Sequence, residues 1–356
     1  MSDAINPTKG SQQASMATPE TPPTLPPSAA LLLMMTGYWM SKAIYVAAKL
    51  GVADHLADGS RSAEELAVAT KAHAPALYRV LRALASIGIF SEVAPGRFAL
   101  TPMASLLRSG TPNSMRALAI MYAEERYRAW DDALYSVQTG RPAFDHAFGA
   151  TYFDYFATHP EASRIFNEAM VGWTTQLTDA VVAAYDFSSF GVVADVGGGH
   201  GALLAAILKS SPTTQGILFD LPQVVESAEP FLTAAGVADR CARVGGDFFT
   251  DMPKGADAYV LAQILHDWDD DRSLAILRQV RQVIPDQGKL LIVELVLPEG
   301  NEPFLGKWLD LHMLVLLGGQ ERTVAQYTAL LHAAGFEMAE VVSTSEPQSI
   351  IDARPV

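Results

Sequence analysis

The sequence predicts an α/β protein in which a seven-stranded, doubly wound sheet follows a mostly α-helical N-terminal domain. After residue 190, short apolar and β-branched runs alternate with helical segments, the pattern of a mostly parallel sheet covered on both faces. Before residue 190 the pattern is helical, with one strand-like pair. The chain has 356 residues, 49% of them hydrophobic, which is enough for two domains and a large core.

Four segments follow from this pattern: a disordered tail over 1–28, an N-terminal domain over 29–112, linking helices over 113–185 and the sheet domain over 186–356. The tail is rich in Ser, Thr and Pro and lacks the apolar core of a signal peptide. The run from Ala29 to Leu50 is apolar enough to resemble a membrane span, but Lys42 and Lys49 interrupt it. We therefore expect a buried helix there, packed against a partner chain.

Charge and cysteine content narrow the class of protein. The net charge of −14 argues against nucleic acid as the main partner, because phosphate binding needs a concentrated positive surface. The single cysteine, Cys241, excludes an intramolecular disulfide framework and suits a reducing compartment. We expect Cys241 to be a small buried residue of a strand, and the protein to be cytoplasmic and not membrane-bound.

The N-terminal domain begins with two short helices. Ser62 and Glu65 have the spacing of a capping box at the start of the first, and Pro75 stands at the start of the second, which Gly88 ends. Two strand-like runs on either side of Pro95 and Gly96 then predict a hairpin.

Helix, turn, helix and hairpin together outline a winged helix. Such a unit can bind DNA, in which case Arg79 and Arg82 would face phosphates, or its helices can pack against a second subunit. The acidic chain and the apolar helix ahead of the unit favour the second use.

The linking helices, over 113–185, are dense in aromatic residues. Most of these must belong to the core, but such a density beside a cofactor domain would also suit an apolar, aromatic substrate site.

The predicted strands lie at 192–196, 216–220, 241–245, 258–262, 289–295, 337–343 and 348–353, and helices begin near Ala202, Val224, Arg272, Phe304 and Val324. Ligands of such sheets bind at the carboxyl ends of the strands.

A glycine turn follows the strand at 192–196. Glycines let the backbone approach a ligand closely, and the next helix presents free N–H groups to negative charge. Gly197, Gly199 and Gly201 are spaced G-x-G-x-G and not G-x-G-x-x-G, which fits a nucleotide-like cofactor without a pyrophosphate. A purely structural glycine turn is the alternative.

Acidic residues end the next two strands. Asp220 follows the glycine turn at about the spacing of a ribose-binding carboxylate. Asp247 and Phe248 could hold an adenine by its amino group and its π surface. Each Asp could instead belong to an ordinary surface turn.

A candidate base ends the fourth strand. His266 sits where catalytic residues of such folds collect, and a neutral imidazole is the natural base near neutral pH. The acidic run Asp269 to Asp271 could suggest a metal, but favours the cap of the following helix.

Two glutamates complete this set. Glu294 lies in an otherwise apolar strand, where a carboxylate is costly unless it is functional or bonded to a partner such as His266. Glu321 is ambiguous, since a salt bridge with Arg322 or a helix-end contact would also explain it.

Together these residues resemble the class I S-adenosylmethionine-dependent O-methyltransferases of the plant caffeate and bacterial polyketide or phenazine type. The resemblance covers nearly everything from Ala29 to the C-terminus, and its motifs are 195–201, 219–224, 245–249, 265–270, 293–294 and 310–323. It implies a homodimer formed through the winged-helix domain, a Rossmann-like catalytic domain, S-adenosylmethionine as cofactor and no metal.

The resemblance also assigns roles to residues. His266 would deprotonate a phenol, with Glu294 and Glu321 flanking and orienting its ring. The implied cofactor residues are Asp195, Gly197, Gly199, Asp220, Leu221, Gly246, Asp247, Phe248, Ala262 and Trp268. The implied substrate residues are Tyr152, Phe156, Phe166, Met170, His312 and Met313.

Two positions depart from the plant pattern. Ala262 stands where plant members often carry a cofactor-contacting lysine, so any side-chain contact from that position is lost. His312 is polar where plant relatives tend to be aliphatic, and either binds the substrate or is a satisfied core histidine.

We therefore expect an enzyme of secondary metabolism that methylates a phenolic or other aromatic hydroxyl of a small natural product, with His266 as the general base. The same scaffold could instead methylate nitrogen or carbon, or retain the cofactor for a different reaction. A ligand-sensing winged-helix regulator is the third possibility.

Overall fold

The structure is a computed structural model that describes residues 25–111 and 113–356, with the backbone alone for 171–176. Two compact units make up the chain, Met1–Met40 and Ser41–Val356. Most of the predicted tail lies outside the described residues. Its end is already helical, because α1 spans Pro27–Met35 and proline is tolerated in the first turn of a helix.

The apolar stretch from Ala29 to Leu50 is not one buried helix. Thr36 separates α1 from α2 (Gly37–Lys49), and large apolar side chains of the stretch are exposed, Met34 by 77% and Trp39 by 61%. The helical stretch Pro27–Lys49 has the length and composition of a membrane span, which core helices of soluble proteins share. The predicted burial is thus wrong for the single chain. An exposed apolar surface of this kind is typical of one that a partner chain covers.

The winged-helix pattern is confirmed between residues 52 and 105. It comprises α3 (Val52–His55), β1 (Arg61–Ser62), α4 (Ala63–Thr70), α5 (Ala74–Ser86), β2 (Phe90–Ala94), β3 (Arg97–Leu100) and α6 (Pro102–Ser105). The side chain of Ser62 accepts the N–H of Glu65, and the Glu65 carboxylate accepts the N–H of Ser62, so the predicted capping box begins α4. The three strands are antiparallel in the order β1-β3-β2.

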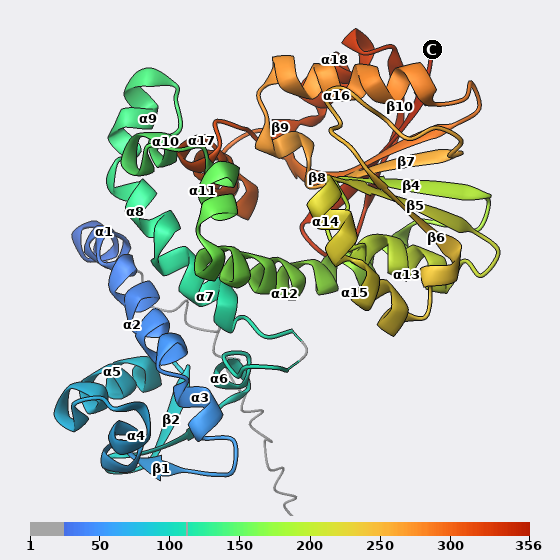
Figure 1. Cartoon of the computed structure of the whole chain (residues 1–356). Coiled ribbons are helices and arrows are strands. Elements are labelled where there is room, and N and C mark those ends of the chain that lie inside the picture. The colour runs from blue at the N-terminus through green and yellow to red at the C-terminus, as the bar shows by residue number, and fades with distance from the viewer. Residues whose placement is uncertain (1–24, 112) are drawn as a thin grey trace, which may run out of the picture. The chain divides into compact units, whose positions relative to one another are not determined.

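Six helices link this domain to the sheet: α7 (Arg116–Ala123), α8 (Glu125–Asp131), α9 (Ala133–Thr139), α10 (Ala143–Phe148), α11 (Tyr152–Thr158) and α12 (Pro160–Ala184). The longest, α12, runs from the other linking helices to the sheet (Figure 1). Near its start Ile165 and Ala169 pack with α7, and near its end Leu177 and Val181 pack beneath the sheet. One helix thereby belongs to two hydrophobic cores.

The large sheet contains all seven predicted strands. They are β4 (Val192–Val196), β5 (Gln215–Asp220), β6 (Cys241–Gly245), β7 (Ala258–Ala262), β8 (Lys289–Leu297), β10 (Phe336–Ser343) and β11 (Gln348–Pro355). Their order is β10-β11-β8-β7-β4-β5-β6, and β11 is antiparallel to both of its neighbours. An eighth, unpredicted strand, β9 (Arg322–Thr323), pairs with the end of β8. Cys241 is buried at the start of β6, as expected.

Helices cover both faces of the sheet (Figure 1). One face packs on α16 (Asp270–Val283) and α18 (Val324–Ala333). The other packs on α12, α13 (Ala202–Ser210), α14 (Pro222–Ser227) and α15 (Glu229–Ala235), the last followed by the short turn η1 (Ala238–Arg240).

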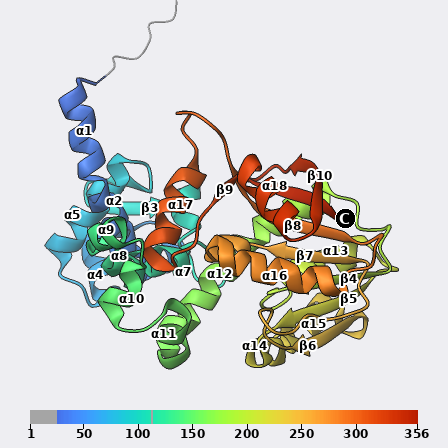
Figure 2. The same ribbon diagram turned by 90° about the horizontal axis from the view of Figure 1, so that it is seen from above.

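The remaining helix, α17 (Leu305–Leu316), lies instead with the linking helices (Figure 2). Its Val315 and Leu316 pack with Ala129 of α8 and Phe144 of α10. Ring contacts between Phe153 of α11 and Trp268 bring the linking helices to the carboxyl edge of the sheet, where the site is built.

Candidate active site

The glycine turn after β4 forms a close-packed cradle at the carboxyl edge of the sheet. The N–H of Gly197 donates to the carbonyl oxygen of Phe219 at 2.7 Å. Gly197 has a φ of +71°, and a Cβ added there would collide with the side chain of Ile264. A Cβ on Gly246, at the end of β6, would come within 2.6 Å of the Phe219 ring. Both positions therefore require glycine, because any side chain there would displace its protein neighbours.

Two carboxylates lie at this cradle. Asp195 is 1% exposed, and its Oδ2 has no hydrogen-bond partner among the residues that the structure describes. Burial, with a smaller contribution from the charge of Asp220, raises the pKa of Asp195 to about 7. Asp220 accepts the N–H groups of Gly199 at 2.8 Å and Leu221 at 2.7 Å, and burial raises its pKa. A buried acceptor with an unused oxygen fits a ligand that brings its own donors, such as an ammonium or ribose hydroxyls.

The other predicted cofactor residues also lie along the carboxyl edge. Gly246 donates its N–H to the carbonyl oxygen of Asp220 at 3.0 Å. Asp247 is exposed and accepts the N–H of Phe249 at 3.0 Å. Phe248 lies 6.2 Å from Trp268, measured between ring centroids. Leu221 is 46% exposed ahead of α14, and Ala262 ends β7 without a polar side chain.

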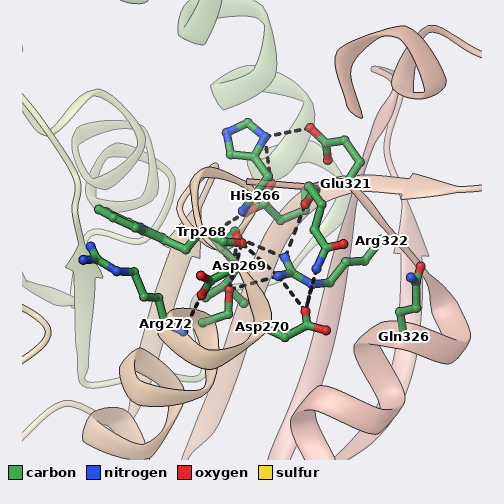
Figure 3. A network of polar contacts seen from close by, with 12 residues as sticks. His266, Trp268, Asp269, Asp270, Arg272, Glu321, Arg322 and Gln326 are labelled. Atoms are coloured by element: carbon green, nitrogen blue, oxygen red, sulfur yellow. Dashed lines mark hydrogen bonds and ion pairs between the residues drawn. The ribbon is translucent and has the colours of Figure 1, made fainter. Parts of the chain in front are cut away.

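His266 lies just beyond β7, in the short turn η2 (Leu265–Asp267), with 8% of its surface exposed. Its Nδ1 is 2.8 Å from Oε1 of Glu321, the contact drawn in Figure 3. Oε2 of Glu294 lies 3.6 Å from the same nitrogen. The structure thus brings together the three residues proposed as catalytic, and Glu321 pairs with His266 and not with Arg322.

Glu294 shapes the turn that carries His266. Its Oε1 accepts the N–H groups of Ile264, Leu265 and His266 at 3.0, 2.9 and 3.3 Å. These bonds satisfy one oxygen of a side chain that is 0% exposed. Within the described residues, Oε2 of Glu294 and Oε2 of Glu321 accept no hydrogen bond.

The carboxylates around His266 make its imidazolium unusually stable. Burial lowers the pKa of His266, but the charges of Glu294 and Asp267 and the hydrogen bond to Glu321 raise it to about 10. Burial raises the pKa of Glu294 to about 7 and that of Asp267 to about 6, against the attraction of His266. Oδ1 of Asp267 lies 3.5 Å from Nε2 of His266. The arrangement can therefore take a proton from a weakly acidic group.

Arg322, on β9, holds the two parts of the site together (Figure 3). Its guanidinium is buried and donates to the carbonyl oxygens of Leu265 at 3.0 Å and Trp268 at 2.9 Å, and it pairs with Asp270 at 2.9 Å. Asp269 accepts the N–H of Arg272 at 2.8 Å and caps α16, as the sequence favoured.

A metal ion could also use the catalytic set, because His266, Glu294 and Glu321 offer ligand atoms within 4.8 Å of one another. The expectation of a metal-free site thus stays a prediction.

The predicted substrate residues divide into three groups. Tyr152, Phe156 and Phe166 form one aromatic cluster, with ring centroids 4.9 Å apart for the first two and 5.0 Å for the last two. Met170 packs in the neighbouring core formed by α7 and α12. His312 and Met313 are both buried on α17.

His312 is held neutral by its surroundings. Its Nδ1 accepts the indole N–H of Trp130 at 2.8 Å, and its Nε2 lies 3.5 Å from Nη1 of Arg126. Burial and the charge of Arg126 lower its pKa to about 3. Sequence reasoning did not single out Arg126 or Asp267, and it took Trp130 only as one of the many aromatic residues in 113–185. The i, i+4 spacing of Arg126 and Trp130 in an aromatic helix, and the place of Asp267 beside His266, were the available signals.

Comparisons with known proteins agree with this geometry. The model of the O-methyltransferase domain matches residues 130–337, and that of the O-methyltransferase dimerisation domain matches 32–110. The phenazine O-methyltransferase PhzM of Lysobacter antibioticus is 58% identical over 332 residues, 93% of this chain and 97% of the relative. An 8-amino-8-demethylriboflavin N,N-dimethyltransferase of Streptomyces davaonensis is 40% identical, over 87% of this chain and 90% of the relative.

The solved structure of LaPhzM superposes with a TM-score of 0.90 at 58% identity, covering 93% of this chain and all of that one. More distant solved neighbours, 39% and 33% identical, are complexes with S-adenosylhomocysteine and S-adenosylmethionine.

A winged-helix domain, a doubly wound sheet with a glycine cradle, and a buried histidine between two glutamates define a two-domain methyltransferase. The chain belongs to the S-adenosylmethionine-dependent O-methyltransferase family.

Proposed function

We propose that the protein methylates a hydroxyl group on the aromatic ring of a small natural product. The observation that carries the proposal is His266, held by Glu321 and Glu294 at the carboxyl edge of the sheet. Tyr152 of the aromatic cluster lies close enough to Asp267, the next residue, to feel its charge. A relative that acts on a phenazine supports a flat, fused-ring acceptor.

The cofactor fits the cradle through the unused oxygen of Asp195, the carboxylate of Asp220 and the open space at Gly199, where an added Cβ would meet nothing within 4 Å. Asp247, Phe248 and Trp268 would border its adenine. When bound, S-adenosylmethionine supplies the electrophilic methyl group. The protein's task is to align the acceptor oxygen with that group and to remove its proton.

Proton removal is the role of His266. Because Nδ1 faces Glu321, Nε2 is the nitrogen that accepts the hydroxyl proton. The pKa of His266, about 10, is close to that of an ordinary phenol, so the proton transfer is nearly balanced. With a usual pKa of about 6.5 the same transfer would be uphill by about 5 kcal/mol. Glu294, Glu321 and Asp267 thus stabilise the imidazolium that forms.

The test is methyl transfer from S-adenosylmethionine to a panel of fused-ring phenols, detected by mass. We expect the wild-type enzyme to methylate at least one of these phenols. On that phenol, His266→Ala should transfer the methyl group much more slowly. Binding of S-adenosylhomocysteine without transfer to any hydroxyl would contradict the proposal.

Methylation of nitrogen is the second candidate, because the riboflavin-type relative is named as an N,N-dimethyltransferase. An aromatic amine panel tested beside the phenols separates the two. The stabilised imidazolium favours the hydroxyl, whose proton must leave before transfer, whereas a neutral amine can attack through its free electron pair.

The exposed apolar surface of α1 and α2 and the dimerisation-domain match support a homodimer formed through the N-terminal domain. We expect it to act in the cytoplasm, away from nucleic acid and membranes. Light scattering tests the dimer, and sedimentation with lipid vesicles tests the membrane prediction.

A further inference from the structure

Arg126 of α8 is a buried cation that forms no ion pair with any carboxylate in the described part of the chain. It is 7% exposed, and its Nε donates to the hydroxyl oxygen of Tyr152 at 3.0 Å. Its guanidinium carbon lies 5.0 Å from the centroid of the Tyr122 ring and 5.8 Å from that of Tyr152. Among residues 25–111 and 113–356, no carboxylate forms an ion pair with it. A buried charge left unpaired is costly, so a site that keeps one invites an anion.

His312 presents a second donor to the same place. An indole nitrogen can only donate, so the contact with Trp130 makes Nδ1 of His312 the unprotonated nitrogen. In this neutral ring the hydrogen is on Nε2, which lies 3.5 Å from Nη1 of Arg126. Two donors therefore face each other with no acceptor between them in the described structure. An oxygen that accepts from both would satisfy this pair.

Arg126 of this donor pair lies close enough to the residue beside His266 for their charges to interact. The charge of Arg126 acts on Asp267, whose Oδ1 is 3.5 Å from the Nε2 that takes the proton. Tyr152, which binds Arg126, belongs to the aromatic cluster. A flat acceptor beside His266 would thus have its far substituents near Arg126 and His312.

We propose that Arg126 and His312 bind an anionic oxygen carried by the acceptor ring in addition to the hydroxyl that is methylated. The inference rests on the proposed function and narrows its substrate class to aromatic hydroxy acids or to rings with a second, ionised oxygen. Guanidinium groups suit this role, since they bind carboxylates by two parallel hydrogen bonds.

The test measures binding of three matched naphthalenes to the enzyme saturated with S-adenosylhomocysteine. The probes are 6-hydroxy-2-naphthoate, 2,6-dihydroxynaphthalene and 2-naphthol. At the end of the ring system far from the hydroxyl, the first carries a carboxylate, the second carries another hydroxyl, and the third carries no polar group. We expect the wild type to bind one of the first two about 10- to 100-fold more tightly than 2-naphthol, as hydrogen bonds to a charged group allow. Which of the two is preferred distinguishes a carboxylate from an ionised ring oxygen.

Variants assign the preference to Arg126. In Arg126→Gln the affinity ratio should fall to within about threefold of one, and Arg126→Lys should keep part of it. Arg128→Gln is the matched control, because Arg128 is exposed on the same helix and its guanidinium lies over the Phe148 ring, away from His312. Its affinity ratio should match that of the wild type. Affinity for S-adenosylhomocysteine shows that each variant is folded.

Equal wild-type affinity for all three probes overturns the inference, as does a preference that survives Arg126→Gln. If Arg126→Gln does not fold, the affinity ratios of the wild type and of Arg126→Lys still test the inference. Methyl transfer is measured separately. A binding preference without methyl transfer contradicts the proposed function but supports the oxygen site. Methyl transfer without a binding preference supports the proposed function but contradicts the oxygen site.

Discussion

Replacing Glu321 by glutamine tests the proposal that Glu321 makes His266 a strong base. Oε1 of Glu321 lies 2.8 Å from Nδ1 of His266, and both side chains are buried. A hydrogen bond to a charged group contributes about 1.5 to 3 kcal/mol, and one pKa unit corresponds to about 1.4 kcal/mol. Glu321→Gln should therefore lower the pKa of His266 from about 10 by about 1 to 2 units.

The sign of the pH effect follows from the need for a neutral imidazole. In the wild type, kcat/KM should rise with pH as His266 loses its proton, and in Glu321→Gln the rise should come about 1 to 2 pH units lower. The plateau should also be lower, because a weaker base with a less fixed ring removes the proton less well.

The assay is initial methyl-transfer rate across the neutral and alkaline range, with two acceptors of different phenol acidity. If the pH at which kcat/KM rises is the same for both acceptors, the group that titrates is on the enzyme and not on the acceptor. Glu337→Gln is the control, since Glu337 pairs with Arg354 on the surface. If kcat/KM rose at the same pH in Glu321→Gln and in the wild type, Glu321 would not be raising the pKa of His266.

Four further predictions concern the cofactor and the base. Because the folded-state pKa of Asp195, about 7, lies above its usual 3.8, stability falls as pH rises between these values. Asp195→Asn should therefore stabilise the cofactor-free enzyme by up to about 4 kcal/mol above pH 7, and thermal unfolding that shows the same gain at acidic pH would contradict this. His266→Ala should lower the rate by about 10²- to 10⁴-fold with little change in calorimetric affinity for S-adenosylhomocysteine; unchanged activity removes His266 as the base. Asp220→Ala should weaken cofactor binding by about 1.5 to 3 kcal/mol in the same titration, and unaltered affinity removes it from the site. Activity should survive a chelator; loss that a metal ion restores would make His266, Glu294 and Glu321 a metal site.

The sheet was predictable because its strands have strong local signals. Val192–Val196 and Lys289–Leu297 are apolar runs set between helical segments, and both form where expected. The two residues of β9 have no pattern of their own, since they pair with β8 only after the chain between them has folded. The burial of α1 was mispredicted, because an apolar run does not show whether it packs against its own chain or against a partner chain.

The catalytic set was found from the places of His266 and Glu294 at strand ends and from the family motifs. The pairing of Glu321 with His266 came from the resemblance alone. From the residues themselves, Glu321 lies 55 residues from His266 and could equally have paired with its neighbour Arg322. Arg126 was missed for a similar reason: its contacts, Tyr152 and His312, are 26 and 186 residues away. Periodicity reports on neighbours along one element and not on contacts between distant ones.

The shared helix α12 also limits how the enzyme can be re-engineered. At about 1.5 Å per residue, its 25 residues form a strut of roughly 37 Å that enters the linking helices at one end and the sheet core at the other. Leu177 and Val181 of α12 belong to the sheet core. A chimaera that takes the linking helices from a relative would replace these two residues or place its joint within α12, and we expect it to misfold. Acceptor preference is better altered by point substitutions on the shorter helices α8, α11 and α17, which leave this strut intact.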